Sequence, residues 1–116
     1  MEKLKIGDKV YNKEHSRWGN NIYYYFGTVE RLTKTQAILN DGTKLINEAT
    51  KNWSEEYYSF MTYGNRYKRW YLTTKEIILE AKSERERQQV IKWFENRKFT
   101  DEEKVIIYNQ FKDVTP

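Results

Sequence analysis

Apolar and polar residues alternate with a two-residue period over the first part of the chain, as in strands that bury one face. The clearest stretch is residues 23–48, in which the apolar run 37–39 is too dense to lie on a surface. An Asp41-Gly42 pair separates two apolar runs there and predicts a type I′ hairpin turn, whose two central residues both need a positive φ. We therefore expect three short antiparallel strands in this stretch.

Further strands flank this stretch on both sides. Residues 4–13 predict a first strand, with Val10 inward and Tyr11 outward. Residues 57–72 predict a hairpin that turns at Gly64-Asn65. From the alternation in this hairpin, we expect three side chains to face the core: Phe60, Trp70 and Leu72.

A glycine inside the second predicted strand has a structural interpretation. Gly27 lies in an otherwise apolar and aromatic run. Glycine within a strand often marks a bulge or a sharp bend. We expect a bend here that lets a small sheet curl into a barrel.

The last forty residues change to a helical pattern, with no glycine and no proline before Pro116. Thr73 with Glu76, and Thr100 with Glu103, have the spacing of capping boxes and predict two helix starts. The polar stretch 82–89 leaves open whether the first helix is continuous or restarts at its centre. The short connection between the helices predicts an antiparallel helical hairpin, closed by Trp93, Phe94, Ile106 and Phe111.

Together these elements predict an α+β protein. We expect a small five-stranded SH3-like antiparallel β-barrel over residues 1–73. A helical hairpin over residues 74–116 would pack on the barrel or extend from it.

Three motifs carry a resemblance to a known group of proteins. They are the opening Ile6–Val10, the strand pair Thr28–Ala37 and the step Trp70–Thr74 into a charged helix. In these motifs the chain resembles small phage-encoded SH3-like β-barrel proteins with a C-terminal helical extension, which are mostly uncharacterised. The resemblance covers most of the chain and implies a phage setting, where such proteins bind host or phage nucleoprotein machinery. It implies no catalytic residue.

The net charge of +4 is unevenly distributed. Residues 1–72 hold 12 basic and 8 acidic side chains, a difference of +4, whereas residues 73–116 hold 9 of each. An anionic partner would therefore meet the N-terminal part. The chain has no cysteine, which excludes disulfides, and it shows no apolar leader or membrane span, so we expect a cytoplasmic protein, in the bacterial host if phage-encoded.

Residues with catalytic or metal-binding chemistry are sparse. His15 is the sole histidine, so no histidine pair can hold zinc, and a Ser-His-Asp triad would need this one loop residue. The five glycines are scattered singly, unlike a phosphate-binding loop. We expect no enzymatic activity, no cofactor and no metal site.

Aromatic residues are abundant, with 10 Tyr, 4 Trp and 5 Phe. A core of this size cannot hide them all, so they either coat the barrel or form a binding face. The densest combination of aromatic and basic residues is at the tip of the hairpin predicted over residues 57–72. A smaller one lies in the polar loop 12–21 after the first predicted strand, where Trp18 could instead plug one end of the barrel. The candidate binding residues are Arg17, Trp18, Tyr63, Arg66, Tyr67, Lys68 and Arg69.

These observations predict a non-enzymatic binding protein. The favoured partner is a host or phage nucleoprotein complex engaged by direct contact, as by an inhibitor of a bacterial defence system. One alternative is a barrel that binds DNA or RNA through the basic-aromatic tip, by base stacking and phosphate contacts. Another is a self-associating module that forms a homodimer through its C-terminal helices.

Overall fold

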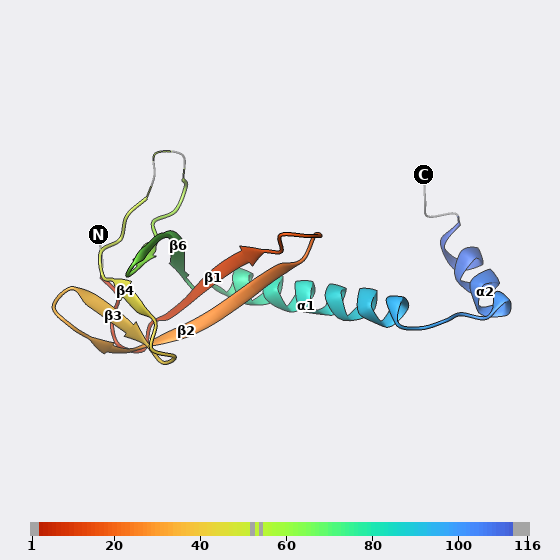
Figure 1. Cartoon of the computed structure of the whole chain (residues 1–116), viewed down its shortest axis with the longest axis horizontal. Coiled ribbons are helices and arrows are strands. Elements are labelled where there is room, and N and C mark those ends of the chain that lie inside the picture. The colour runs from red at the N-terminus through yellow and green to blue at the C-terminus, as the bar shows by residue number, and fades with distance from the viewer. Residues whose placement is uncertain (1–2, 52, 54, 113–116) are drawn as a thin grey trace. The chain divides into compact units, whose positions relative to one another are not determined.

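The computed structural model describes residues 3–51, 53 and 55–112, apart from the side chain of Arg66. Over these residues six strands precede two helices, which confirms the α+β class and the order of barrel and helices (Figure 1). The strands and helices are β1 (Lys9–His15), β2 (Ile22–Leu32), β3 (Gln36–Leu39), β4 (Lys44–Ile46), β5 (Phe60–Thr62), β6 (Asn65–Leu72), α1 (Lys75–Glu95) and α2 (Asp101–Phe111).

The six strands form one closed antiparallel barrel, in which each strand pairs with its sequence neighbours and β6 returns to β1. The ladder closes where Val10 pairs with Leu72 and Tyr11 with Tyr71. The predicted count of five strands was therefore one too low. The segments that the sequence predicts as strands, one over residues 4–13, three over 23–48 and two over 57–72, already number six, so the error lay in the count and not in the segments. The strands β4 and β5 have only three residues each and pair through Leu45 and Thr62.

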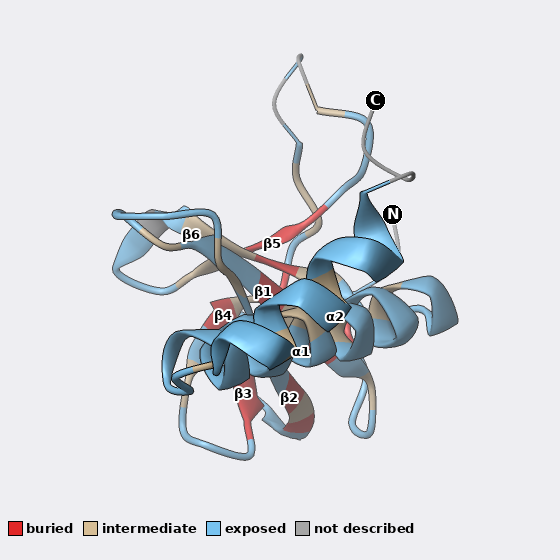
Figure 2. Cartoon of the chain, turned by 90° about the vertical axis from the view of Figure 1, so that its right-hand side faces the viewer, coloured by how far each residue is buried: buried red, intermediate tan, exposed pale blue. Residues whose placement is uncertain are grey.

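The core of the barrel is small and built from the strands. Figure 2 shows the buried residues on the strands and exposed residues over both helices. The predictions for Phe60 and Trp70 are confirmed, but the prediction for Leu72 is wrong, since this last residue of β6 is 53 % exposed. The cluster of buried apolar side chains comprises Leu4, Val10, Val29, Ala37, Leu39, Leu45, Phe60 and Trp70.

The turn between β3 and β4 differs in type from the prediction. Leu39 and Thr43 flank a three-residue loop, in which Gly42 N–H donates to the Leu39 carbonyl over 2.9 Å. Gly42 has a φ of +91°, whereas Asp41 does not have a positive φ. Three-residue hairpin loops of this kind end in a residue with a left-handed conformation. The Asp41 carboxylate accepts from Thr43 N–H instead, which holds the pKa of Asp41 below its usual value.

Two further sequence predictions shift in position. The turn between β5 and β6 is formed by Tyr63 and Gly64, and Asn65 already belongs to β6. The bulge expected at Gly27 lies at Glu30, where the register between β2 and β3 changes. Gly27 instead pairs regularly with Val10.

The segment before β1 is held by one buried amide. The Asn47 carboxamide accepts from Leu4 N–H over 2.7 Å and donates to the Leu4 carbonyl over 3.2 Å. Both residues are buried. This reciprocal pair keeps the Leu4 side chain in the core.

The helix α1 follows β6 with two intervening residues. Thr73 N–H still donates to the Lys9 carbonyl of β1, and the Thr74 hydroxyl accepts from Ile77 N–H. Thr74 therefore caps the helix in place of the predicted Thr73, because Thr73 is retained by the barrel ladder. The helix is continuous through its polar centre, which resolves the alternative left open by the sequence.

The helix α2 starts as predicted. Its N-cap Thr100 accepts from Glu103 N–H, and the Glu103 carboxylate accepts from Thr100 N–H in return. In the connection before it, the ring of Phe99 lies 5.3 Å from that of Phe94 and 5.6 Å from that of Trp93. The predicted closure of the two helices by Trp93, Phe94, Ile106 and Phe111 is not found among the described residues. The first two rings contact Phe99 of the connection instead, and Ile106 and Phe111 are more than half exposed.

The chain divides into two compact units, residues 1–84 and 85–116, so the boundary falls inside α1. Neither helix, within the residues described, is both long and apolar enough to span a bilayer.

Gly27 offers a test of how tightly the core is packed. A Cβ at this position would lie 2.8 Å from Cδ1 of Leu39, a side chain that is fully buried. We expect Gly27→Ala to lower the free energy of unfolding by about 1–3 kcal/mol through overpacking, measured by urea denaturation. In the double variant Gly27→Ala/Leu39→Val the two losses should be less than additive, and strict additivity would contradict the collision.

Candidate functional site

A largely apolar hollow on the first unit is lined by tyrosines. It has a volume of about 770 Å³ and lies where β1, β6, the segment before β5 and the first turn of α1 meet. Lys13, His15, Thr74 and Glu76 also border it. We call it the tyrosine groove and define it by its apolar and aromatic residues: Tyr11, Tyr57, Tyr58, Tyr71, Leu72 and Ile77.

The barrel closure creates the floor of this groove. Pairing of β1 with β6 sets Tyr11 opposite Tyr71, and their ring centres lie 5.5 Å apart. The pKa of Tyr11 is raised by burial and then by the neighbouring Tyr71, Glu80 and Tyr57. Tyr11 therefore keeps its proton at neutral pH and remains able to donate a hydrogen bond.

The start of α1 forms one wall and is fastened to the barrel by a carboxylate. Glu80 accepts from the Tyr24 hydroxyl over 2.6 Å and lies 3.4 Å from Lys13 Nζ. One turn later, Glu84 accepts from Ile22 N–H over 3.2 Å. The Tyr24 hydrogen bond is the main cause that lowers the pKa of Glu80. These contacts hold Ile77 and Glu76 against the groove.

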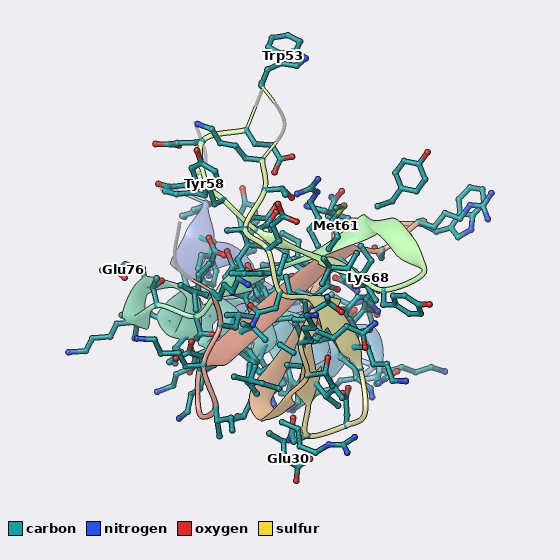
Figure 3. The ribbon with its side chains drawn as sticks, turned by 90° about the vertical axis from the view of Figure 1, so that its left-hand side faces the viewer. Glu30, Trp53, Tyr58, Met61, Lys68 and Glu76 are labelled. Carbon is teal, nitrogen blue, oxygen red and sulfur yellow. The ribbon has the colours of Figure 1, made fainter. Side chains whose placement is uncertain are left out.

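A second hollow of about 560 Å³ adjoins the tyrosine groove, because Lys13 and Tyr71 line both. Its remaining walls are Asn12, Glu55, Met61, Tyr67 and Arg69, and we call it the polar hollow. In Figure 3, Tyr58 and Glu76 of the tyrosine groove lie on one side, and Met61 of the polar hollow lies on the other. The two hollows therefore adjoin, one of them largely apolar and the other polar.

The Arg69 side chain makes hydrogen bonds within the protein and does not extend into solvent. Its Nη1 donates to the Thr50 carbonyl over 3.3 Å, to the Thr50 hydroxyl over 3.0 Å and to the Ser59 hydroxyl over 2.9 Å. Its Nε lies 4.0 Å from the Glu55 carboxylate, which also accepts from the Tyr71 hydroxyl. The side chain is only 15 % exposed. Arg69 thus closes the base of the loop that carries Tyr57 and Tyr58.

The buried amide of Asn12 lies in the wall of the polar hollow. Asn12 is 5 % exposed; its Nδ2 donates to the Arg69 carbonyl, while its Oδ1 lacks a hydrogen-bond partner among the described atoms. An unsatisfied buried acceptor is costly. It offers an acceptor to any donor that reaches the hollow.

The residues of the predicted basic-aromatic tip do not form one surface in the structure. Tyr63 and Tyr67 are exposed, but the Lys68 ammonium lies 3.5 Å from the Glu14 carboxylate and 5.9 Å from the Tyr25 ring. Arg69 points into the network described above, and the Arg66 side chain lies outside the described part of the chain. The charge expected at the tip is therefore partly neutralised by acids that lie far away in the sequence.

The other predicted pair, Arg17 and Trp18, lies in the loop between β1 and β2. This loop is shorter than predicted, because β1 continues to His15. Trp18 is 87 % exposed and so does not plug the barrel. Trp53 is likewise almost fully exposed to solvent at the end of its loop (Figure 3).

Sequence reasoning missed the tyrosine groove, although it placed Tyr11 and Tyr71 on outward strand faces. Their proximity depends on the closure between β1 and β6, which lie more than fifty residues apart. Tyr57 and Tyr58 precede β5 and lie outside the strand in which they were predicted. The adjacent tyrosines Tyr57 and Tyr58 at the start of that segment are the one local signal of an aromatic surface there, and the sequence analysis did not use it.

The role of Arg69 can be separated from that of its neighbour. We expect Arg69→Ala to lower the free energy of unfolding by about 1–3 kcal/mol, because it leaves the buried Ser59 hydroxyl without its donor. Lys68→Ala should change it by no more than about 0.5 kcal/mol, since its ion pair is exposed. Urea denaturation of both variants measures the two free energies of unfolding. Equal losses in the two variants would contradict the structural role of Arg69.

The hydrogen bond between Tyr24 and Glu80 predicts a pH dependence. A carboxylate whose pKa is lowered by folding stabilises the protein above its ordinary pKa, and this stabilisation is lost as the pH falls through the lower folded value. Because Glu80 is half exposed, we expect wild type to exceed Tyr24→Phe by only about 0.5–1 kcal/mol near neutral pH. The difference should shrink progressively as the pH falls below the ordinary pKa of a glutamate, as followed by thermal denaturation, and a pH-independent difference would refute the contact.

The site offers aromatic faces, tyrosine hydroxyls and a few paired charges, which suit noncovalent binding. Within the described ranges, no three histidine, aspartate or glutamate side chains gather as a metal site would require. Searches among known protein families, curated proteins and solved structures return no match to this chain.

Proposed function

We propose that this chain is a non-enzymatic protein-binding module that holds a segment of a partner protein in the tyrosine groove. The observation that carries the proposal is the convergence of Tyr11, Tyr57, Tyr58 and Tyr71 on one apolar hollow. Tyrosine supplies a large contact area with only two side-chain torsions to fix, and it is enriched where proteins bind each other.

The composition of the groove favours a partner segment with apolar side chains. Its apolar floor would take these, and the hydroxyls of Tyr11, Tyr57 and Tyr58 would donate to backbone carbonyls of an extended segment. The adjoining polar hollow would receive a hydrogen-bonding side chain next to Arg69, Glu55 and Asn12. A polyanion fits this surface less well, because Arg69 and Lys13 are already paired with Glu55 and Glu80.

The finer parts of the proposal rest on the sequence. The resemblance to small phage-encoded SH3-like proteins supports a partner in a host or phage nucleoprotein complex, blocked by direct contact as by an inhibitor of a bacterial defence system. The scarcity of convergent titratable groups supports a role without catalysis.

A second candidate is nucleic-acid binding, favoured by the exposure of Trp18 beside Arg17 and of Tyr67 on β6. Bases stack on solvent-exposed aromatic rings, and every base offers a face for stacking. Binding of this kind weakens steeply with added salt, whereas an aromatic protein interface responds little. Salt dependence therefore separates the two candidates.

The proposal predicts the outcome of a capture experiment. Immobilised wild-type protein should retain a discrete protein from a nuclease-treated bacterial lysate at high salt, and the variant Tyr57→Ala/Tyr58→Ala should lose it. The matched control is Tyr23→Ala/Tyr63→Ala, which removes two tyrosines of similar exposure outside the groove. Loss of an interface aromatic typically costs about 1–4 kcal/mol, enough to abolish capture.

Two outcomes would overturn the proposal. If both double variants retain the partner equally, the groove is not the binding surface. If the captured material disappears with nuclease and is lost on Trp18→Ala, the second candidate holds instead. Circular dichroism of each variant confirms that the barrel remains folded.

A further inference from the structure

The strand β1 is longer than the ladder that joins it to β6. It pairs with β2 along its whole length, as far as His15. Its register with β6 comprises only Val10 with Leu72 and Tyr11 with Tyr71. Figure 1 shows β1 and β2 continuing together as a hairpin past β6. Among the described residues, closure therefore covers this edge of β1 only as far as Tyr11.

The hydrogen bonds at the two ends of β1 show which main-chain groups point to this edge. The N–H and C=O of one residue in an antiparallel strand point to the same side, and successive residues alternate between the two sides. Ser16 N–H donates to the Asn21 carbonyl over 2.8 Å, so even-numbered residues of β1 bond to the β2 side. Thr73 N–H donates to the Lys9 carbonyl over 2.9 Å, so odd-numbered residues face the β6 side. Beyond Tyr11, the odd-numbered residues of β1 are Lys13 and His15.

The facing edge of β6 is satisfied within the protein. The Arg69 carbonyl accepts from Asn12 Nδ2 over 2.9 Å, and Tyr67 N–H donates to the Asn65 carboxamide over 3.2 Å. No described side chain does the same for the main chain of Lys13 on β1. Of the two diverging strands, β1 is therefore the one that presents an open edge.

The surroundings of this edge favour a single extended chain as its occupant. Lys13 borders both hollows and His15 borders the tyrosine groove, which Tyr57 and Tyr58 line from the loop before β5. A strand lies only about 5 Å from its neighbour in a sheet, whereas a second folded barrel is too bulky to enter between β1 and this loop. The partner that β1 has at Lys9, an antiparallel main chain, is also the partner that its open edge fits.

We propose that a segment of a partner protein adds to β1 as an antiparallel strand beside Lys13 and His15. The inference rests on the proposed function and specifies how the tyrosine groove holds its segment. The main chain of the segment exchanges hydrogen bonds with Lys13 and His15, and alternate side chains of the segment lie against the tyrosines. In strand addition of this kind, main-chain hydrogen bonds supply affinity and the side-chain sites supply specificity.

Synthetic peptides test the inference. Random peptides of about six residues, the usual length of a strand, are selected on the immobilised full-length protein. The selected peptide is then remade with one main-chain nitrogen methylated at a time. We expect methylation at every second position to weaken binding about tenfold in calorimetric titrations, because only alternate residues of the peptide direct their N–H to β1. Equal losses at neighbouring positions would overturn the inference.

A proline at position 13 tests the same edge from the side of the protein. Lys13→Pro removes an N–H that does not bond to β2, so the barrel should remain folded, as proline is tolerated on an edge strand. We expect it to bind the selected peptide at least about tenfold more weakly than Lys13→Ala, which loses the same side chain but keeps the N–H. Amide hydrogen exchange of wild type needs no substitution. The peptide should slow exchange at Lys13 and His15 more than at Asn12 and Glu14, which bond to β2.

The outcomes separate this inference from the proposed function. If Tyr57→Ala/Tyr58→Ala abolishes peptide binding while Lys13→Pro binds as Lys13→Ala does, the groove holds the segment without β1 and only this inference is overturned. If wild type selects no peptide, or the tyrosine variant binds as wild type does, both are overturned. If wild type dimerises in sedimentation equilibrium and Lys13→Pro abolishes the dimer, a second copy occupies the edge and the inference is wrong.

Discussion

Everything else in the first unit depends on the pairing of β1 with β6. This ladder joins the two ends of the barrel through Val10 with Leu72 and Tyr11 with Tyr71. On the inner face it completes the wall around Val10, Phe60 and Trp70. On the outer face it brings Tyr11 and Tyr71 together as the floor of the tyrosine groove. Closure of a sheet also removes its edges, which otherwise invite pairing with other chains.

A small core explains why so much aromatic surface remains outside. The barrel buries one Phe and one Trp almost completely, and the other large rings remain partly or fully in contact with solvent. Several of these rings are stabilised by charges: Lys13 lies over Tyr24, Lys51 over Tyr58 and Lys68 over Tyr25. Lys13, Lys68 and Arg69 are paired with acidic side chains, and this pairing reduces the attraction of the surface for nucleic acid. The net positive charge of the composition is therefore larger than the unpaired positive charge that a partner would meet.

The sequence predicted the features that depend on local pattern. The strands around residues 23–48, the inward Val10 and the capping box at Thr100 all follow from periodicity or from contacts three residues apart. The predictions failed where the position of a side chain depends on contacts with residues that are distant in the sequence. Arg69 was predicted in a solvent-exposed tip because its neighbours are basic and aromatic, but its acceptors are on Thr50 and Ser59. The groove likewise requires a register between β1 and β6 that no local pattern contains.

The junction between β6 and α1 fixes the rotational phase of the helix. Thr73 is still bonded to β1 while Thr74 already caps α1, so no free linker separates strand from helix. A helix turns by about 100° per residue, and Glu80 reaches Tyr24 only in the present phase. One residue inserted at the junction would turn Glu80 away and bring another face of α1 against β1 and β2. The hydrogen bond of Thr73 to β1 therefore determines which side chains of α1 border the tyrosine groove.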